Sequence, residues 1–479
     1  MSANGIDPAD LDVCLRVLGE LDALPVEHPD AVAVRRATAG LFKTVKLRRR
    51  AQRRAAILTA DAAVTAATAT GARGRIDDET AGLPLRSSAG GATAGTLVRT
   101  RACYVCKQRY IDVDAFYHQL CPTCAARNHA RRAARTDLRG RRALLTGGRA
   151  KIGMYIALAL LRDGAETTIT TRFPRDAARR FAAMADSADW LHRLRIVGID
   201  LRNPAQVVAL ADEIAAQGPL DILINNAAQT VRRSAESYAL LARAEAAPLP
   251  AGPLPPICTF GPGGAASGLQ APADAVRRGH WTPTPHALTA LALSAGSASP
   301  ELTAAEQAID AGGLVPDLDS VNSWSRRVED VDPVELLEVQ LCNQTAPFIL
   351  AGRLRGALAA SRARRTYIVN VSAMEGQFHR GYKGPGHPHT NMAKAALNML
   401  TRTSAREMLR DGILMTSVDT GWITDERPHP TRMRLAGGGF HAPLDLVDGA
   451  ARVYDPIVRG EAGEDLHGCF LKDYESAPW

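Results

Sequence analysis

The 479-residue chain has few aromatic side chains and no long apolar run. Phe, Trp and Tyr make up 5% of its residues, so alanine, valine and leucine must fill most of any core. It contains no stretch of about 18 uninterrupted apolar residues, and its first residues are acidic where a secretory signal is basic and then apolar. We therefore expect a cytoplasmic protein with no membrane segment.

A deficit of acidic residues is confined to the N-terminal part of the chain. Residues 1–142 carry 24 Lys and Arg against 14 Asp and Glu, whereas the remainder carries 34 against 36. A basic surface attracts nucleic acid, anionic lipid or acidic protein, but basic helical runs are more commonly solvated faces. Nucleic acid is therefore a less favoured partner of the N-terminal region.

Cysteine is infrequent, but its spacing is informative. Four of the eight cysteines form two close pairs, Cys103 with Cys106 and Cys121 with Cys124. Without a secretion signal, clustered pairs favour metal over disulfides. Two such turns complete the tetrahedral four-sulfur shell that zinc accepts, so we predict a structural zinc ion, with an iron–sulfur cluster or unligated thiols as alternatives.

A closed four-cysteine shell leaves no open position for a substrate. We therefore expect the module to be independent of any nucleotide site, so that Cys121→Ser unfolds the module and leaves nucleotide binding intact. His118, between the two pairs, is expected to be an ordinary surface residue.

Changes of periodicity divide the chain into three parts. Residues 1–100 are predicted to be helical over 10–66, with a linker at 70–98, and residues 101–138 hold the zinc module. From residue 139 short apolar runs alternate with amphipathic helices, which is typical of an α/β fold with a doubly wound parallel sheet. We predict strands near 142–146, 166–171, 194–199, 221–225, 365–371, 414–418 and 468–472.

One connection in this α/β part is abnormally long. About 100 residues rich in Ala, Pro and Gly separate Asn226 from a helix that begins near Pro333, where a compact domain needs only a few. We interpret residues 229–328 as an insertion. Because it leaves the C-terminal end of a strand, where such sheets bind ligands, we expect it to cover the mouth of the site.

A glycine-containing turn follows the first strand of the α/β part. Such a turn lets backbone N–H groups and a helix N-terminus approach a pyrophosphate. The candidate cofactor residues in this turn are Thr146, Gly147, Gly148, Arg149, Ile152 and Gly153. The turn alone is a weak signal, but INNAA at 224–228, Ser372, Lys394 and VDTGWIT at 418–424 follow it in order.

This ordered set resembles the short-chain dehydrogenase/reductase superfamily over about residues 140–479 outside the insertion. The resemblance implies a Rossmann fold, a nicotinamide cofactor and hydride transfer with a carbonyl or alcohol substrate, and we expect a homo-oligomer. It assigns Asp200 and Leu201 to the adenine ring, Asn226 to the loop beside the cofactor and Ile423 to the nicotinamide amide. Asp200 serves equally well as a turn residue.

The chain departs from the family pattern in its glycine turn and in its last motif. Lys151 stands where the family has its middle glycine, so we expect a reshaped phosphate loop. Asp419 and Thr420 stand where an Asn-Pro pair usually precedes Gly421.

The end of the second strand bears on the choice of cofactor. In the family, an acidic residue at the position of Thr171 bonds the ribose of NAD and repels a phosphate. Here that carboxylate is absent, and Arg172 can pair with a 2′-phosphate through two N–H groups. We predict NADP, with NAD possible if Arg172 is merely solvated.

The catalytic residues implied by the resemblance are incomplete. Ser372 matches the serine that steadies the substrate oxygen, Lys394 the lysine that also bonds the nicotinamide ribose, and Asn343 the asparagine that holds a water. The tyrosine is replaced by Thr390, whose hydroxyl is far less acidic than a phenol with a pKa of about 10.

Two residues between Ser372 and Lys394 are candidates for a displaced proton donor, Tyr382 first and His389 second. If neither acts, the chain is instead a catalytically weak nucleotide sensor that uses its zinc module to contact a partner. The fold does not choose a substrate.

Overall fold

The computed structural model describes residues 5–73, 75, 85–234, 236–260, 266–267, 313–381 and 383–479. Its largest unit is a ten-stranded sheet in the order β12-β11-β10-β9-β6-β3-β4-β5-β7-β8. Neighbouring strands in this sheet are parallel, except at its two edges, where β11 pairs with β12 and β7 with β8 in antiparallel fashion. The strands are β3 (Arg142–Leu145), β4 (Glu166–Thr171), β5 (Leu194–Gly198), β6 (Ile222–Asn225), β7 (Ile257–Phe260), β8 (Ala266–Ser267), β9 (Thr366–Ser372), β10 (Ile413–Asp419), β11 (Phe470–Lys472) and β12 (Glu475–Ala477).

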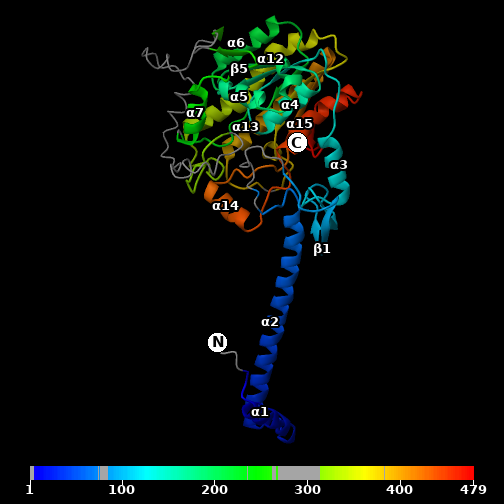
Figure 1. The fold of residues 1–479 in the computed structure, drawn as a ribbon, viewed down its shortest axis with the longest axis vertical. Helices are drawn as coiled ribbons and strands as arrows, with labels where there is room; N and C mark the ends of the chain where they lie inside the picture. Colours follow the sequence, from blue (N-terminus) through cyan, green and yellow to red (C-terminus); the bar gives the residue numbers. More distant parts are fainter. Residues whose placement is uncertain are drawn as a thin grey trace.

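Helices cover both faces of the sheet (Figure 1). One core lies under α4 (Lys151–Arg162), α5 (Pro174–Ala182) and α15 (Leu446–Glu461). The other lies under α6 (Pro204–Ala216), α12 (Ala346–Ala359) and the end of α13 (Pro388–Met408). Leu145 packs into the first core and Leu144 into the second, because successive strand residues point to opposite faces. The predicted doubly wound parallel sheet is confirmed, and each predicted strand is present to within two residues.

The order of the strands reverses beside β3, which pairs with β4 on one side and with β6 on the other. Doubly wound sheets bind ligands in the crevice outside the strand C-termini at such a point. Within the described residues, the other α-helices of this part are α7 (Ala239–Ala246), α11 (Pro333–Gln340) and α14 (His429–Gly437), with a π-helical turn at Leu341–Thr345.

The segment predicted to be an insertion contributes to the sheet. Ile196, Val197 and Gly198 of β5 align with Ile257, Cys258 and Thr259 of β7. No strand is predicted from the sequence within residues 229–328, so β7 was missed. The tetrapeptide ICTF that forms β7 directly follows a proline-rich run. The composition of this run predicts a loop, so the strand could not be recognised.

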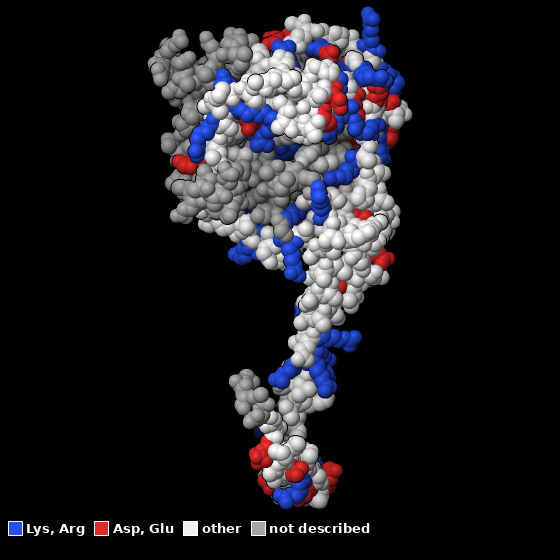
Figure 2. Space-filling model, viewed as in Figure 1, with Lys and Arg blue, Asp and Glu red and all other residues white. Residues whose placement is uncertain are grey.

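The N-terminal part forms a stalk that ends in the cysteine module. α1 (Pro8–Glu20) buries no residue and α2 (Pro29–Ala67) buries only Ala31, and most of α2 extends away from the sheet (Figure 1). At 39 residues, α2 is roughly 58 Å long. Basic residues gather along its middle, whereas both signs meet at its tip (Figure 2). Among the described helices, none combines the length and apolar character that a bilayer crossing requires.

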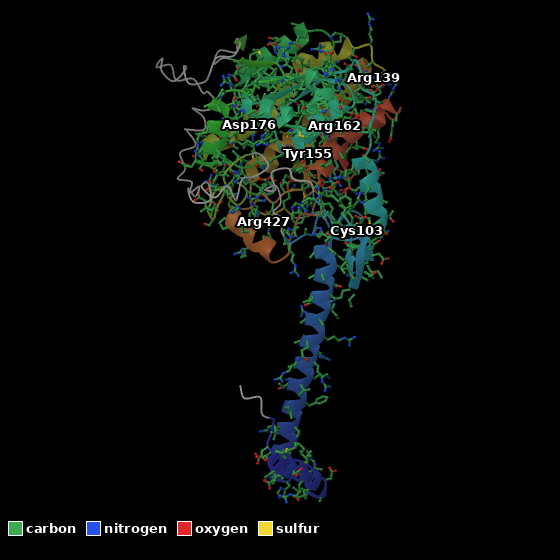
Figure 3. All side chains as sticks on the ribbon, viewed as in Figure 1. Cys103, Arg139, Tyr155, Arg162, Asp176 and Arg427 are labelled. Carbon is green, nitrogen blue, oxygen red and sulfur yellow. The ribbon has the colours of Figure 1, made fainter. Side chains whose placement is uncertain are left out.

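The cysteine module consists of the antiparallel pair β1 (Thr93–Ala102) and β2 (Arg109–Asp114), followed by α3 (Pro122–Arg132). It lies where the stalk meets the Rossmann part, near the labelled Cys103 (Figure 3). β1 begins inside the segment predicted to be a linker, so that prediction is wrong from Thr93 onward. Only one residue of β1 is fully buried, so the strand needs no alternating apolar pattern. Its glycine, alanine and threonine residues therefore have the composition expected of a linker.

Candidate active site

A cavity of about 1060 Å³ opens at the C-terminal ends of the central strands. It brings together residues that are far apart in the sequence. The predicted site residues that line it are Gly147, Arg149, Ile152, Gly153, Arg172, Asp200, Leu201, Asn226, Ser372, Thr390, Lys394 and Ile423. Its lining also includes both ends of the predicted insertion, through Gln229 and Trp324.

The glycine turn between β3 and α4 is tightly held against the loop after β6. Gly147 has a φ of +72°, and a Cβ there would lie 2.9 Å from Ala227 Cα. A Cβ on Gly153 would lie 2.0 Å from the Gly147 carbonyl oxygen, so the helix approaches the turn more closely than any side chain permits. Asn226 Nδ2 donates to the carbonyl oxygens of Thr146 and Gly147 at 3.0 and 3.1 Å.

Lys151 occupies a glycine-type conformation at the start of α4. Its φ of +55° lies in the left-handed region, where a side chain costs about 1–2 kcal/mol. The backbone thus keeps the conformation that glycine normally adopts. The side chain of Lys151, in place of the single hydrogen atom of a glycine, lines the cavity.

Arg172, directly after β4, lies beside a stacked pair of aromatic rings and lines the cavity. Its guanidinium carbon is 5.6 Å from the centroid of Phe173 and 5.4 Å from that of Tyr238, and Nη2 donates to Tyr238 Oη at 3.3 Å. Among the described residues it makes no ion pair with a carboxylate. Its remaining N–H groups are therefore available to an anionic ligand.

Asp200, beyond β5, is engaged by Arg202. Its carboxylate accepts Arg202 Nε at 3.0 Å and Nη2 at 2.7 Å, as well as the backbone N–H of Arg202. Burial would raise the pKa of the Asp200 carboxyl, but these hydrogen bonds and the charge of Arg202 hold it below its usual value. This geometry matches the turn role that the sequence left open.

Lys394 lies on α13 and reaches the end of β9. Its Nζ donates to the Val371 carbonyl oxygen at 2.7 Å, and burial lowers the pKa of its ammonium group to about 8. Ser372 Oγ and Thr390 Oγ1 are buried, and neither has a hydrogen-bond partner within the described residues. Both residues line the cavity beside Lys394, so a ligand there would satisfy two hydroxyls that otherwise carry a desolvation cost.

Asn343 and His389 are not among the residues that line the cavity. Asn343 sits in the π-helical turn, where Oδ1 accepts the Gln229 N–H at 2.7 Å and Nδ2 donates to the Gln229 carbonyl at 3.0 Å. His389 is buried with Nε2 3.4 Å from Glu335 Oε1, and it is not among the residues that line the cavity. Tyr382 lies outside the described residues.

The cysteine module brings its four sulfur atoms together as the sequence predicts. The Sγ atoms of Cys103, Cys106, Cys121 and Cys124 all lie within 4.8 Å of one another. An ion 2.3 Å from each corner of a tetrahedron separates the sulfurs by about 3.8 Å, and Cys106 and Cys121 are 3.7 Å apart. The donor set and its spacing therefore fit a zinc ion.

His118 is not the surface residue that the sequence predicts. It is 2% exposed, and its Nδ1 lies 2.8 Å from Thr70 Oγ1. Burial, together with the charges of Arg75 and Arg101, lowers the pKa of its ring to about 3. The chain that precedes β1 folds back over the histidine, which local sequence could not reveal.

Two residues of the cysteine module line the cavity and were missed from the sequence. Tyr104 and Lys107 belong to the loop around the first cysteine pair. Tyr104 Oη accepts the backbone N–H of Trp422, 318 positions later in the chain, at 2.9 Å. No local pattern signals a contact across that separation.

Comparisons with known proteins show which families and proteins this chain is similar to. The family model described as short chain dehydrogenase matches residues 141–243. An uncharacterized protein of Acanthamoeba polyphaga mimivirus is 30% identical over 372 residues, which cover 74% of this chain and 71% of that protein. A probable oxidoreductase of Streptomyces antibioticus is 42% identical over 91 residues, 19% of this chain and 30% of that protein.

Solved structures with a similar fold include the NADPH-bound carbonyl reductase from chicken fatty liver. It is 18% identical, with 71% of this chain and 100% of that one covered and a TM-score of 0.43. A short-chain dehydrogenase from Burkholderia cenocepacia in complex with NADP is 20% identical, with 70% and 97% covered and a TM-score of 0.42.

The fold and the glycine turn are those of a Rossmann-type α/β domain. By its match to the short chain dehydrogenase model over residues 141–243, this part of the chain belongs to the short-chain dehydrogenase/reductase superfamily.

Proposed function

We propose that this protein is an NADP-dependent oxidoreductase that acts on a small carbonyl or alcohol substrate. The observation that carries the proposal is the cluster of Lys394 with the unpartnered hydroxyls of Ser372 and Thr390 on one cavity wall. Buried polar groups without hydrogen-bond partners cost free energy in a core. A buried lysine beside two unpartnered hydroxyls therefore favours a site that binds a ligand oxygen.

Several of the predicted cofactor residues have a distinct role in this proposal. The backbone of the glycine turn would hold the pyrophosphate, Arg172 the 2′-phosphate, Lys394 the nicotinamide ribose and Ile423 the nicotinamide amide. Asp200 is already engaged by Arg202, so its proposed adenine contact uses the remaining lone pairs of the carboxylate. The nicotinamide would supply or accept the hydride.

The chain's own residues would bind and orient the substrate. Ser372 Oγ donates a hydrogen bond to the substrate oxygen, and the Lys394 ammonium group raises the local potential and so favours a proton donor with a lowered pKa. Asn343 fixes the loop after β6 through Gln229. For the donor itself we keep Tyr382 first, because His389 faces Glu335.

Zinc is proposed as a structural ion held by the four cysteines. The four thiolates fill a tetrahedral shell, which leaves no coordination position for a substrate. The ion would hold the loop at Cys103–Cys106 against the start of α3.

This proposal is tested by measuring catalytic turnover. The protein, purified without chelator, should oxidise NADPH in the presence of at least one member of a panel of aldehydes and ketones. With the same compound it should oxidise NADPH faster than NADH. Tight NADPH binding with no turnover on any carbonyl or alcohol would favour the alternative of a nucleotide sensor. The buried Thr390 in place of the family's tyrosine is the observation that favours that alternative.

The stalk supports one further candidate, binding of nucleic acid. Residues 31–60 carry nine Lys or Arg and no Asp or Glu, and this stretch of α2 contains only one fully buried residue. Such binding should weaken steeply with added salt. The absence of salt-sensitive binding to DNA or RNA would rule this candidate out.

A further inference from the structure

The loop around the first cysteine pair packs on the segment that the family uses to contact nicotinamide. Besides the hydrogen bond from Trp422 to Tyr104, Lys107 Nζ donates to the Tyr104 carbonyl oxygen. Gly421 has a φ of +79°, and a Cβ there would lie 3.6 Å from Tyr104 Oη and 2.6 Å from Leu444 Cδ1. The turn after β10 is therefore closed on one side by the cysteine module.

On its other side, this turn is held by the residue that departs from the family pattern. Asp419 Oδ1 accepts the Gly421 N–H at 2.9 Å, and Oδ2 pairs with Lys472 Nζ at 2.6 Å. The turn has no proline to stiffen it. Tyr104 supplies a constraint from outside the Rossmann part.

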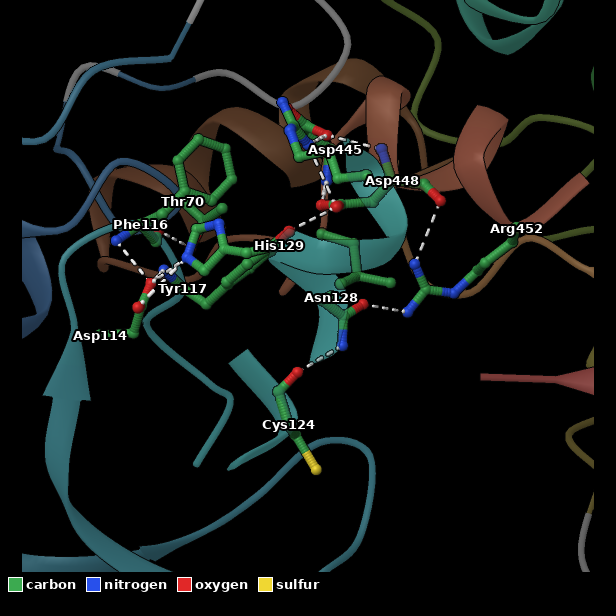
Figure 4. Close-up of polar contacts among 12 residues, drawn as sticks. Thr70, Asp114, Phe116, Tyr117, Cys124, Asn128, His129, Asp445, Asp448 and Arg452 are labelled. Atoms are coloured by element: carbon green, nitrogen blue, oxygen red, sulfur yellow. Dashed lines mark hydrogen bonds and ion pairs between the residues drawn. The ribbon is translucent and has the colours of Figure 1, made fainter. Parts of the chain in front are cut away.

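The second cysteine pair is tied to α15. The Cys124 carbonyl accepts Asn128 Nδ2 at 2.7 Å, and Asn128 Oδ1 accepts Arg452 Nη2 at 2.9 Å (Figure 4). Asn128 and Arg452 are 1% and 2% exposed. A continuous chain of buried hydrogen bonds thus runs from a predicted metal ligand into a helix that covers the sheet.

Two further contacts hold the module to the start of α15. Arg132 pairs with Asp445 through two hydrogen bonds of 2.5 and 2.7 Å, and Tyr117 Oη donates to Asp448 Oδ1 at 2.6 Å. Asp448 is fully buried. Removal of one partner of a buried charged pair is strongly destabilising, so α15 depends on the position of the module.

Predicted cofactor contacts share an apolar cluster with the cysteines. Ile423 and Ile152 pack with Cys103, Cys121 and Leu444. A Cβ on Gly449 of α15 would lie 2.2 Å from Ile423 Cδ1, so the isoleucine has no space to move toward the helix. The cavity side of this cluster is therefore set by the module and by α15 together.

We propose that the cysteine module forms a wall of the cofactor cleft and that metal binding and nicotinamide-nucleotide binding are thermodynamically coupled through it, with Tyr104 as the positioning residue. The inference rests on the proposed NADP binding. It reverses the expectation, drawn from the sequence, that Cys121→Ser leaves nucleotide binding intact. It also assigns the module a role besides local stability.

Coupling between two sites is reciprocal. If the metal raises affinity for the nucleotide by some factor, the nucleotide raises affinity for the metal by the same factor. This equality provides a test of coupling. At a purely structural site, the free energy of zinc dissociation would be the same with and without bound nucleotide.

The experiment measures both halves of the cycle on the full chain. NADPH affinity is titrated with zinc bound, after zinc is removed by a chelator, and after Zn²⁺ is restored. The equilibrium transfer of zinc to a colorimetric chelator is measured with and without saturating NADPH. We expect zinc removal to weaken NADPH binding by at least about tenfold, within the usual range of allosteric coupling, with recovery on Zn²⁺ addition and a matching tightening of zinc by NADPH.

Tyr104→Phe and Tyr110→Phe form a matched pair of variants. Tyr110 Oη donates to the His118 carbonyl at 2.9 Å inside the module and does not line the cavity. Tyr104→Phe should keep its zinc and reduce the coupling by about fivefold, the usual worth of one hydrogen bond. Tyr110→Phe should leave the coupling at the parent value.

The outcomes separate the two proposals. NADPH binding that is unchanged by zinc removal, or equal loss of coupling in both tyrosine variants, overturns the inference and leaves the proposed function standing. A zinc-loaded parent that binds no NADPH overturns both.

Discussion

The two ends of the cavity are built in different ways. The end at Arg172 uses side chains that follow β4 and one tyrosine that stacks on them, since the rings of Phe173 and Tyr238 lie 6.0 Å apart and nearly parallel. The end at Lys394 joins α13, the turn after β10, α15 and the cysteine module. We infer that a change at the first end alters NADP affinity and leaves NAD affinity nearly unchanged, whereas a change at the second alters the binding of both nucleotides, the chemistry and the metal site together.

The largest expected effect is at the second end. Lys394→Met removes the cation that contacts the Val371 carbonyl and faces the unpartnered hydroxyls. Hydride transfer should fall by at least about 100-fold, the lower range of a general acid–base contribution, and NADPH binding should weaken as well. Steady-state rates and a fluorescence titration measure the two effects.

Lys43→Met is the control for this change. Lys43 is exposed on α2 and is not among the residues that line the cavity. Its rate should stay within about twofold of the parent, as is usual for a surface change. A Lys394→Met protein that keeps parental activity would contradict the proposed chemistry.

At the first end, Arg172→Ala should weaken NADP binding by about 10- to 100-fold, as expected for the loss of charge-assisted hydrogen bonds to a phosphate. NAD carries no 2′-phosphate, so its affinity should change little. Calorimetric titration of both nucleotides gives the ratio. Arg195→Ala is the control, because Arg195 pairs with Glu213 away from the cavity. Equal weakening of NADP and NAD would show that Arg172 only supports the fold.

The same contrast explains which parts of the site the sequence could predict. Arg172 and the glycine turn each follow a strand, Ser372 is the last residue of one, and strands are visible as short apolar runs. The roles of Ser372 and Lys394 came from the resemblance to the family, through their place in its ordered set of motifs. Each of these motifs lies within a short stretch of the sequence.

Residues positioned by long-range contacts were missed or misjudged. Tyr104 and Lys107 come from a module whose docking on residues 419–424 depends on buried partners in α15. His118 is buried by Thr70, and β7 is recruited to the sheet from within a proline-rich segment. His389 lies one position before Thr390 in the sequence, yet helical geometry turns it toward Glu335 and away from the cavity. In each case the deciding contact joins residues that a sequence window does not contain.

The smallest predicted effect is a dependence on pH that only the second end should show. The pKa of Lys394 is lowered to about 8 by burial, so its positive charge is present below that pH and is lost as the pH rises through it. NADPH is anionic between about pH 7 and pH 9, so its affinity should decrease by roughly threefold over this interval. The change is modest because one charge at an effective dielectric near 20 contributes only part of the binding free energy. Bound phosphates stabilise the cation, so the pH midpoint of the Lys394 titration in the complex should lie above that of the free protein.

In Lys394→Arg the guanidinium stays protonated over the whole interval and the pH dependence of the affinity should vanish, whereas Arg172→Ala should retain it. Titrations at constant ionic strength measure the affinity at each pH. A decrease that persists unchanged in Lys394→Arg would assign the titration to another group and remove the distinction between the two ends.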